Sequence, residues 1–260
     1  MRSYTRHQLK EDRFAKTISD QVHWTVEHRN TMIIATVVVL IVAIGGVIAW
    51  DQMRKRDDKA SFAFGTAMRT YTAPITSPEQ PARAGVQSFA SMRERSAVAH
   101  KEFQKVADEY SSTRNGKYAL YLAGVTAMES GDSKKGEEIL NKVASVNDRN
   151  ISSLAKFSLA SQYVSQNKEA DAVRLYKEVI AADAATVPKT TAQLELAGYY
   201  EVKNPAEAIK IYEEIQKTEE TSRKANAPKV AKGATPAPET KTPLEQMATA
   251  KIAQMKQATK

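Results

Sequence analysis

The side chains that could act as acids, bases, nucleophiles or metal ligands lie far apart in this sequence. It has four histidines and no cysteine, so disulfides, thiolate catalysis and cysteine-ligated zinc are excluded. His100 stands alone, and the other histidines precede residue 30 without zinc-motif spacing. There is no phosphate-binding glycine loop or nucleophile elbow, and the acidic pairs at 213–214 and 219–220 are typical of solvated helix faces. The sequence therefore predicts a protein that is not an enzyme and needs no cofactor or metal.

The net charge of +8 is concentrated near the C-terminus. Residues 221–260 hold eight basic and two acidic side chains, whereas residues 111–220 hold 14 basic and 16 acidic ones. A DNA-binding fold would instead carry its positive charge on its folded face. We therefore expect proteins, and no nucleic acid, as partners.

Residues 31–50 form a run of 20 residues without a charged side chain. A helix of that length rises about 30 Å, the thickness of the hydrocarbon core of a bilayer. A cleaved signal would begin closer to the N-terminus and end at small residues, but residues 1–30 precede this run and AWDQMRKR closes it. A core helix would show a polar face, which the run lacks. The run predicts a permanent transmembrane anchor, with Trp50 at the membrane–water interface.

The residues that flank this run do not fix its orientation. Basic residues occur before it, at Arg13, Lys16 and Arg29, and after it, at Arg54, Lys55, Arg56 and Lys59. Counting them leans slightly towards a cytoplasmic C-terminal side, but long domains cross membranes largely regardless of nearby charge. In the N-terminal tail, residues 1–30, apolar side chains recur every four positions, which predicts an amphipathic helix. They are Phe14, Ile18, Val22 and Val26.

A pattern of small and large residues repeats within residues 57–220. Three pairs of predicted helices align, each with a polar turn between its two helices. The middle of each first helix holds a small residue, at Gly124, Ala160 and Ala197. Each second helix holds a small residue and, four positions later, a large one: Gly136 and Leu140, Ala172 and Tyr176, Ala208 and Tyr212. Because corresponding positions are 36 or 37 residues apart, we expect helical hairpins that stack into an all-α solenoid.

The two ends of the repeat region are less regular. Upstream, Ala99 and Phe103 fit the second-helix pair of an irregular first unit. Downstream, residues 221–241 are rich in Lys, Ala and Pro and are predicted to be a disordered linker. Residues 242–257 predict a final helix that begins with a capping box and covers the exposed end of the last repeat.

These features resemble the tetratricopeptide repeat family over residues 117–217. The matching motifs are LAG at 122–124, GD at 131–132 and KEADAVRLYKEVI in the second unit. In a superhelix of such hairpins, the inner face is lined by the first helices and is the expected binding surface. The register places six candidate partner-binding residues on that face: Tyr121, Val125, Phe157, Ser161, Leu194 and Gly198.

Two roles are open for the aromatic candidates. Tyr121 and Phe157 are 36 residues apart, and they either offer an aromatic surface to an extended peptide or pack between hairpins. Some members of the family hold the C-terminal carboxylate of a peptide with Lys and Asn on the first helices. Those residue types are missing from the candidate positions, so that mode of binding is not expected.

The layout of the whole chain resembles the membrane-anchored bacterial tetratricopeptide-repeat proteins related to the ancillary subunit of the Sec translocon. Shared features are a short N-terminal tail, one anchor starting near residue 31, a small repeat array and a short final helix. The resemblance implies a single-pass protein of the bacterial inner membrane, with a cytoplasmic N-terminus and a periplasmic repeat domain. It also implies a non-enzymatic adaptor that contacts translocon subunits or envelope chaperones.

Two other functions remain compatible with the sequence. One is a coordinator of envelope assembly or cell division that acts independently of the translocon. The other is a cytoplasm-facing scaffold whose basic tail contacts lipid or RNA.

Overall fold

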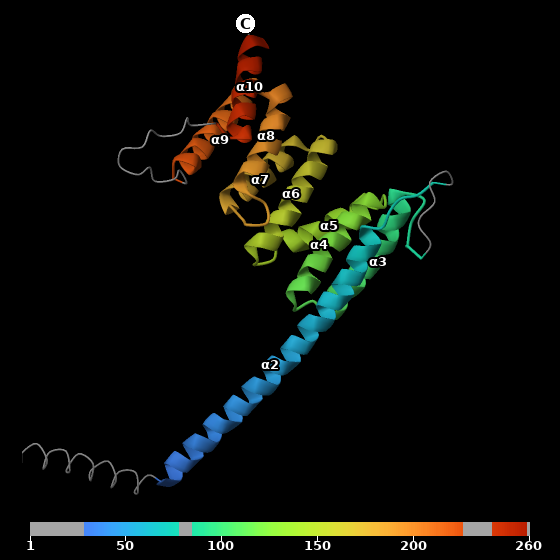
Figure 1. Cartoon of the computed structure of the whole chain (residues 1–260), viewed down its shortest axis with the longest axis vertical. Coiled ribbons are helices and arrows are strands. Elements are labelled where there is room, and N and C mark those ends of the chain that lie inside the picture. The colour runs from blue at the N-terminus through green and yellow to red at the C-terminus, as the bar shows by residue number, and fades with distance from the viewer. Residues whose placement is uncertain (1–28, 78–84, 226–240, 259–260) are drawn as a thin grey trace, which may run out of the picture. The chain divides into compact units, whose positions relative to one another are not determined.

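The computed structural model describes residues 29–77, 85–225 and 241–258, which are mostly helical (Figure 1). In chain order the helices are α2 (Arg29–Tyr71), α3 (Met92–Glu109), α4 (Arg114–Glu129), α5 (Ser133–Ala144), α6 (Arg149–Ser165), α7 (Glu169–Ala182), α8 (Lys189–Lys203), α9 (Pro205–Ala225) and α10 (Pro243–Ala258). Among these described residues, extended pairing is limited to two isolated bridges. The predicted all-α fold class is therefore confirmed. The amphipathic helix predicted for the N-terminal tail falls outside the described residues.

The first compact unit covers residues 1–58 and contains the apolar part of α2. Its large apolar side chains between Ile33 and Ile48 are 48% to 68% exposed. By length and composition the helix is apolar enough to cross a membrane. At the end of the apolar run, the Arg54 guanidinium lies 4.0 Å from the centre of the Trp50 ring.

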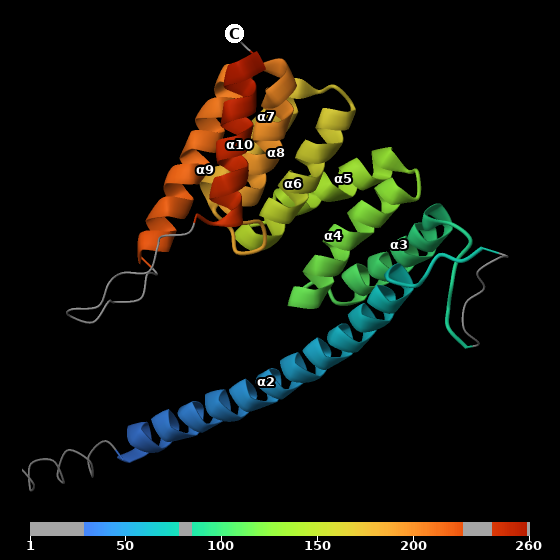
Figure 2. The same cartoon turned by 45° about the horizontal axis from the view of Figure 1, so that its top comes forward.

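The second compact unit covers residues 59–260, and we call it the repeat domain. Its helices pair in chain order as antiparallel hairpins: the last turns of α2 with α3, then α4 with α5, α6 with α7, and α8 with α9 (Figure 2). Each hairpin also packs against the next one, through α3 on α4, α5 on α6, and α7 on α8. Helix α10 packs on α9 as the first helix of a further hairpin would.

Small residues allow the helices of a hairpin to approach closely. A Cβ atom added at Gly136 would lie 2.4 Å from Cγ of Met128 and 2.7 Å from the carbonyl oxygen of Gly124. A Cβ atom added at Gly124 would lie 2.8 Å from Cγ of Leu140. In the two later hairpins, alanines take these positions and are fully buried: Ala160, Ala172, Ala197 and Ala208. The residues that repeat every 36 positions therefore lie where the helices cross.

Two of the hairpin turns share a backbone conformation. Gly131, between α4 and α5, has φ 99°, and Asn167, 36 residues later between α6 and α7, has φ 57°. Both lie in the left-handed region, which Gly and Asn tolerate best. Asp132 then caps α5 by accepting a hydrogen bond from the N–H of Lys135 at 3.1 Å. The turn before α9 differs, because Pro205 is the first helical residue there.

The core of the first hairpin is built around Phe103. Its side chain is fully buried and meets the ring of Phe64 at 5.7 Å and the ring of Tyr71 edge-on at 6.0 Å. These aromatic contacts join α3 to the last turns of α2.

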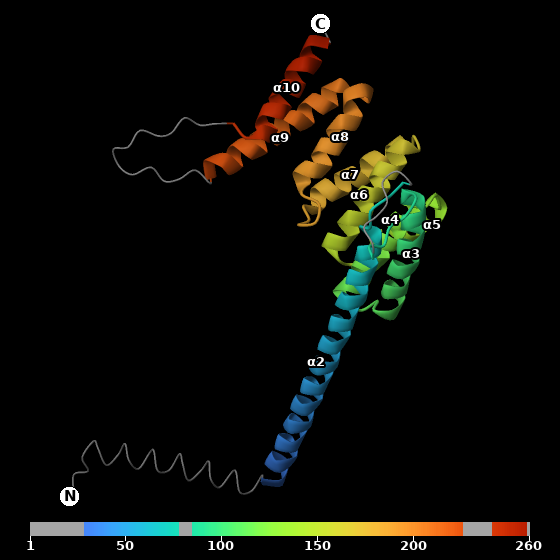
Figure 3. The same ribbon diagram turned by 45° about the vertical axis from the view of Figure 1, so that its right-hand side comes forward.

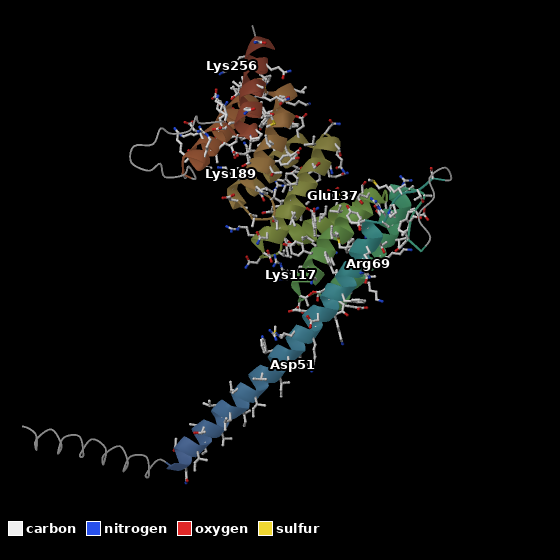
Figure 4. The ribbon with its side chains drawn as sticks, in the orientation of Figure 1. Asp51, Arg69, Lys117, Glu137, Lys189 and Lys256 are labelled. Carbon is white, nitrogen blue, oxygen red and sulfur yellow. The ribbon has the colours of Figure 1, made fainter. Side chains whose placement is uncertain are left out.

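Tyrosine-to-glutamate hydrogen bonds join neighbouring helices of the repeat domain. The hydroxyl of Tyr163 on α6 donates to Glu137 Oε1 on α5 at 2.9 Å, and Glu137 is labelled in Figure 4. The hydroxyl of Tyr71 donates in the same way to Glu129 Oε1 at 2.9 Å. Because hydrogen bonds are directional, they fix the relative position of two helices more precisely than apolar packing alone.

The C-terminal helix α10 begins with a capping box. The N–H of Thr242 donates to Glu245 Oε2 at 2.8 Å, and the N–H of Glu245 donates to Thr242 Oγ1 at 3.1 Å. The predicted linker differs at its start, because α9 continues as helix over residues 221–225. An ion pair between Lys224 and Glu220 at 2.6 Å joins this extension to the preceding turn. The linker was predicted from its Lys, Ala and Pro content, which does not show that Lys224 can pair with Glu220 one helical turn earlier.

Candidate functional site

An open groove of about 560 Å³ lies in the C-terminal half of the repeat domain. Helices α6, α7, α8, α9 and α10 line it, and Figure 3 shows α8, α9 and α10 together. We call it the α8 groove, because α8 contributes the most lining residues. Its apolar lining consists of Val164, Tyr176, Leu194, Tyr199, Tyr212 and Met247.

Three of the six predicted partner-binding residues line this groove: Ser161 on α6, and Leu194 and Gly198 on α8. Leu194 and Gly198 are four residues apart and share one face of the helix. Gly198 is exposed, and a Cβ atom added there would meet no atom within 4 Å. The repeat register thus places these positions on the groove wall, and their contact with a partner stays a prediction.

The other three predicted residues lie outside the groove lining. Tyr121, Val125 and Phe157 are half-buried and pack against the core of the central hairpins. The hydroxyl of Tyr121 lies 3.1 Å from Oγ of Ser158 on the next hairpin, and the Phe157 ring meets the Tyr176 ring edge-on at 5.8 Å. Burial raises the pKa of Tyr121, although its hydrogen bond to Ser158 opposes that shift. The Tyr121 contact is packing between hairpins, one of the two roles left open above, whereas the Phe157 ring contact lies within the hairpin of α6 and α7.

Helix α10 supplies groove residues that the repeat register does not predict. Met247 and Lys251 line the groove from α10, whereas Ala248 and Met255 on the same helix are buried against α9. Met247 is 38% exposed, so it faces the groove and not the core. The sequence does contain one sign of this role. Met247 and Lys251 are four residues apart, so they lie on one face of α10, next to the face that Ala248 and Met255 bury. Helix α10 therefore both covers the last hairpin and forms one wall of the groove.

An ion pair holds α10 against α8 inside the groove. Lys251 Nζ lies 2.9 Å from Glu201 Oε1, and the hydroxyl of Tyr212 on α9 donates to the same oxygen at 2.6 Å. Burial by itself raises the pKa of Glu201, but the hydrogen bonds from Tyr212 and Lys251 outweigh it and leave this pKa below its usual range. The pKa of Tyr212 is raised, first by burial and then by its bond to the carboxylate. Glu201 is thus a charged group whose partners are already supplied by the protein.

Glu195 is the other acidic residue of the groove wall. Its carboxylate is exposed, and within the described part of the chain no ion pair or hydrogen bond joins it to another residue. Burial raises the pKa of Tyr176 to about 12, and the charge of Glu195 adds to this, while a hydrogen bond with Ser161 opposes it.

A second hollow of about 520 Å³ lies along α3 and the start of α5. Its charged side chains are partly engaged with one another, since Lys105 lies 3.9 Å from Glu109 and Gln104 donates to Asp108 at 2.8 Å. His100 also lines it, with Nδ1 2.8 Å from the carbonyl oxygen of Ala123. This solitary histidine is held by the backbone of α4. Nowhere in residues 29–77, 85–225 and 241–258 do three or more His, Cys, Asp or Glu side chains gather as metal ligands.

The groove can therefore offer a ligand an apolar and phenolic surface, one free carboxylate and a bare stretch of helix backbone. The described lining contains no histidine, and its acidic side chains take part in no nucleophile–base arrangement. These groups are suited to noncovalent binding of a polypeptide.

Residues 23–185, more than half of the chain, match the sequence profile of the tetratricopeptide repeat-like domain. The chain belongs to the tetratricopeptide repeat-like domain family. The match includes the apolar run and the hairpins as far as α7, and it ends before α8. Three of the five helices that line the α8 groove thus lie beyond the matched residues. Proteins with such repeats are generally non-enzymatic scaffolds for protein–protein interaction.

Solved structures share the fold of this tetratricopeptide repeat-like chain. The crystal structure of nearly identical TPR-like repeats of a candidate kinesin light chain from Podosopora anserina is 14% identical, with a TM-score of 0.50 over 78% of this chain and 88% of that one. A single-substitution variant of the same repeats is 15% identical, with a TM-score of 0.50 over 78% and 87% of the two chains. At these identities the likeness shows the fold alone. No curated protein sequence gives a significant match.

Proposed function

We propose that this chain is a membrane-tethered adaptor that binds partner polypeptides in the α8 groove. The observation that carries the proposal is the groove itself: an open surface in a repeat domain, where the core leaves Tyr199, Leu194 and Met247 partly uncovered. Exposed aromatic and apolar surface of this kind costs solvation free energy, and a bound polypeptide would cover it.

The apolar segment of α2 supports the tether. Its large side chains between Ile33 and Ile48 are all about half exposed or more, which in water would leave a wide apolar surface uncovered. A bilayer covers such a segment on every side, because a helix satisfies its own backbone hydrogen bonds. Trp50 with the guanidinium of Arg54 over its ring fits the membrane–water interface at the end of the segment. Tethering would raise the local concentration of the groove at the membrane, so that each contact can be weak.

The placement that we propose is the bacterial inner membrane, with the repeat domain in the periplasm and contact with translocon subunits or envelope chaperones. It is supported by the layout of the chain: a tail, one anchor, a short repeat array and a final helix. The basic residues around the anchor lean slightly the other way, which makes orientation the first property to test. A reporter that works only in the periplasm should be active when it is fused to the C-terminus, and one that works only in the cytoplasm should be inactive there. The opposite result contradicts this placement.

The binding role can be tested by photo-crosslinking in intact membranes. A photoreactive amino acid in place of Leu194 lies in the groove, whereas the same residue in place of exposed Lys177 on α7 serves as a matched control outside it. We expect discrete crosslinked products from position 194 and none of these products from position 177. The same products in equal yield from both positions would refute the groove as the binding site. Identification of the products then tests the link to translocon subunits and chaperones.

A further inference from the structure

Two helical glycines of the repeat domain, Gly65 and Gly198, have open space where a Cβ atom would lie, and Gly198 is the one that lines the α8 groove. Gly116, Gly124 and Gly136 are required by packing, because a Cβ atom at each would lie within 3 Å of another atom. Gly198 has no such neighbour within 4 Å, and it lies in the middle of α8. Glycine is the least favourable helix residue after proline, so the helix itself gains nothing from it. The open space above Gly198 is part of the groove, and a ligand could approach the helix backbone closely there.

Glu195 lies one turn from Gly198 on the same side of α8. The two residues are three positions apart, and Leu194 and Gly198 are four apart, so the carboxylate, the bare backbone and an aliphatic side chain share one face. The other charged groups of the groove, Glu201 and Lys251, neutralise each other at 2.9 Å. Glu195 therefore leaves the groove with one uncompensated negative charge next to apolar surface.

We propose that the α8 groove selects extended polypeptide segments in which a lysine or arginine adjoins an apolar residue. The cation pairs with Glu195, the ligand backbone lies against Gly198, and the apolar side chain packs between Leu194 and Met247. This inference rests on the proposed function, since it names the class of segment that the groove receives. Charge complementarity favours this occupant, because an acidic segment would bring its carboxylate against Glu195 without a free cation in the groove lining.

Selection among defined peptides tests the proposal on the full-length protein in detergent micelles. The probes are N-acetylated, C-amidated decapeptides of randomised Ala, Leu, Val, Ser and Tyr, with one central position fixed as Lys, Gln or Glu. Retention of each set on the immobilised protein is measured by mass spectrometry. We expect the wild type to retain the Lys set about tenfold better than the Glu set. The Lys set gains an attraction to Glu195 and the Glu set suffers a repulsion from it, and each effect is modest at an exposed site.

Five variants separate the charge from the shape of the groove. Glu195→Gln should bring the Lys and Gln sets to equal retention, and Glu195→Lys should reverse the preference towards the Glu set. Glu220→Lys makes the same change in charge on exposed α9 and should leave the preference unchanged. Gly198→Trp should lower the retention of all sets by filling the groove. As a milder change at that position, Gly198→Ala keeps the helix intact and should lower retention less.

The outcomes distinguish this inference from the proposed function. If Gly198→Trp abolishes retention but the Lys set is not preferred, or the preference ignores Glu195, the groove binds peptides and the proposed selectivity is wrong. If Gly198→Trp leaves retention unchanged, or no set is retained by the wild type, both the selectivity and the groove as a peptide site are wrong.

Discussion

Replacement of Gly136 by alanine should destabilise the repeat domain, whereas the same replacement at Gly198 should stabilise it. Both glycines lie inside helices, so each alanine gains about 1 kcal/mol of helix propensity. They differ in what the new methyl group meets. At Gly198 it meets nothing within 4 Å, and at Gly136 it would lie 2.4 Å from Met128 Cγ and 2.7 Å from the Gly124 carbonyl oxygen.

The loss of unfolding free energy expected for Gly136→Ala depends on which atoms obstruct the new methyl group. Met128 Cγ belongs to a flexible side chain that could move, but the Gly124 oxygen and the Met128 nitrogen, at 3.0 Å, belong to the backbone of α4. The two helices must therefore separate, and overpacking of this kind costs about 1–3 kcal/mol. Because the backbone is involved, we expect the upper part of that range. After the propensity gain, the net loss is about 1–2 kcal/mol.

The assay is urea unfolding of the full-length chain in detergent, followed by circular dichroism at 222 nm. We expect a lower midpoint for Gly136→Ala and a higher midpoint for Gly198→Ala than for the wild type, at similar dependence on urea. Gly124→Ala should fall between them, because the atom that it approaches most closely is Leu140 Cγ, which belongs to a side chain. A Gly136→Ala protein as stable as the Gly198→Ala protein would refute the close approach of α4 and α5.

Further predictions concern the core, the groove and α10. Phe103→Ala should lower the free energy of unfolding by about 3–5 kcal/mol in the same urea assay, because the ring is fully buried; a loss under about 1 kcal/mol would contradict that packing. Tyr212→Phe removes the 2.6 Å bond to Glu201 and should cost about 1 kcal/mol in that assay, and no change would mean that the bond is not formed in solution. The lowered pKa of Glu201 implies stability that is complete above the ordinary glutamate pKa and is lost as pH falls through the lowered one. Hydrogen–deuterium exchange of α10, corrected for its intrinsic pH dependence, should therefore accelerate in acid, and the acceleration should be smaller in Lys251→Met.

The repeat architecture could be predicted because its constraints are local and periodic. Gly124 and Gly136 are needed wherever two helix backbones approach closely, and such positions recur once per hairpin at 36 residues. The left-handed turn residues Gly131 and Asn167 follow the same period. These features depend on neighbours within one hairpin, so a single sequence contains them.

The groove could be predicted only in part, because it depends on contacts between hairpins. Tyr121 and Phe157 occupy the same register as Leu194, yet the following hairpin covers them, and Tyr121 meets Ser158 there at 3.1 Å. After α9 the register breaks: α10 packs on α9 with Ala248 fully buried, 51 positions after Ala197 and not 36. Met247 could therefore not be assigned to the groove from the repeat.

The central claim is that the α8 groove recruits a polypeptide partner to the membrane, and co-purification of groove variants tests it most directly. The wild type, Gly198→Trp and Val202→Trp are extracted from membranes under identical conditions, and the proteins that accompany each are quantified. Val202 is 84% exposed on the same helix but does not line the groove, so its tryptophan controls for added apolar surface. The account predicts that partners retained by the wild type and by Val202→Trp are lost from Gly198→Trp. The same partners in equal amounts with all three proteins would contradict it.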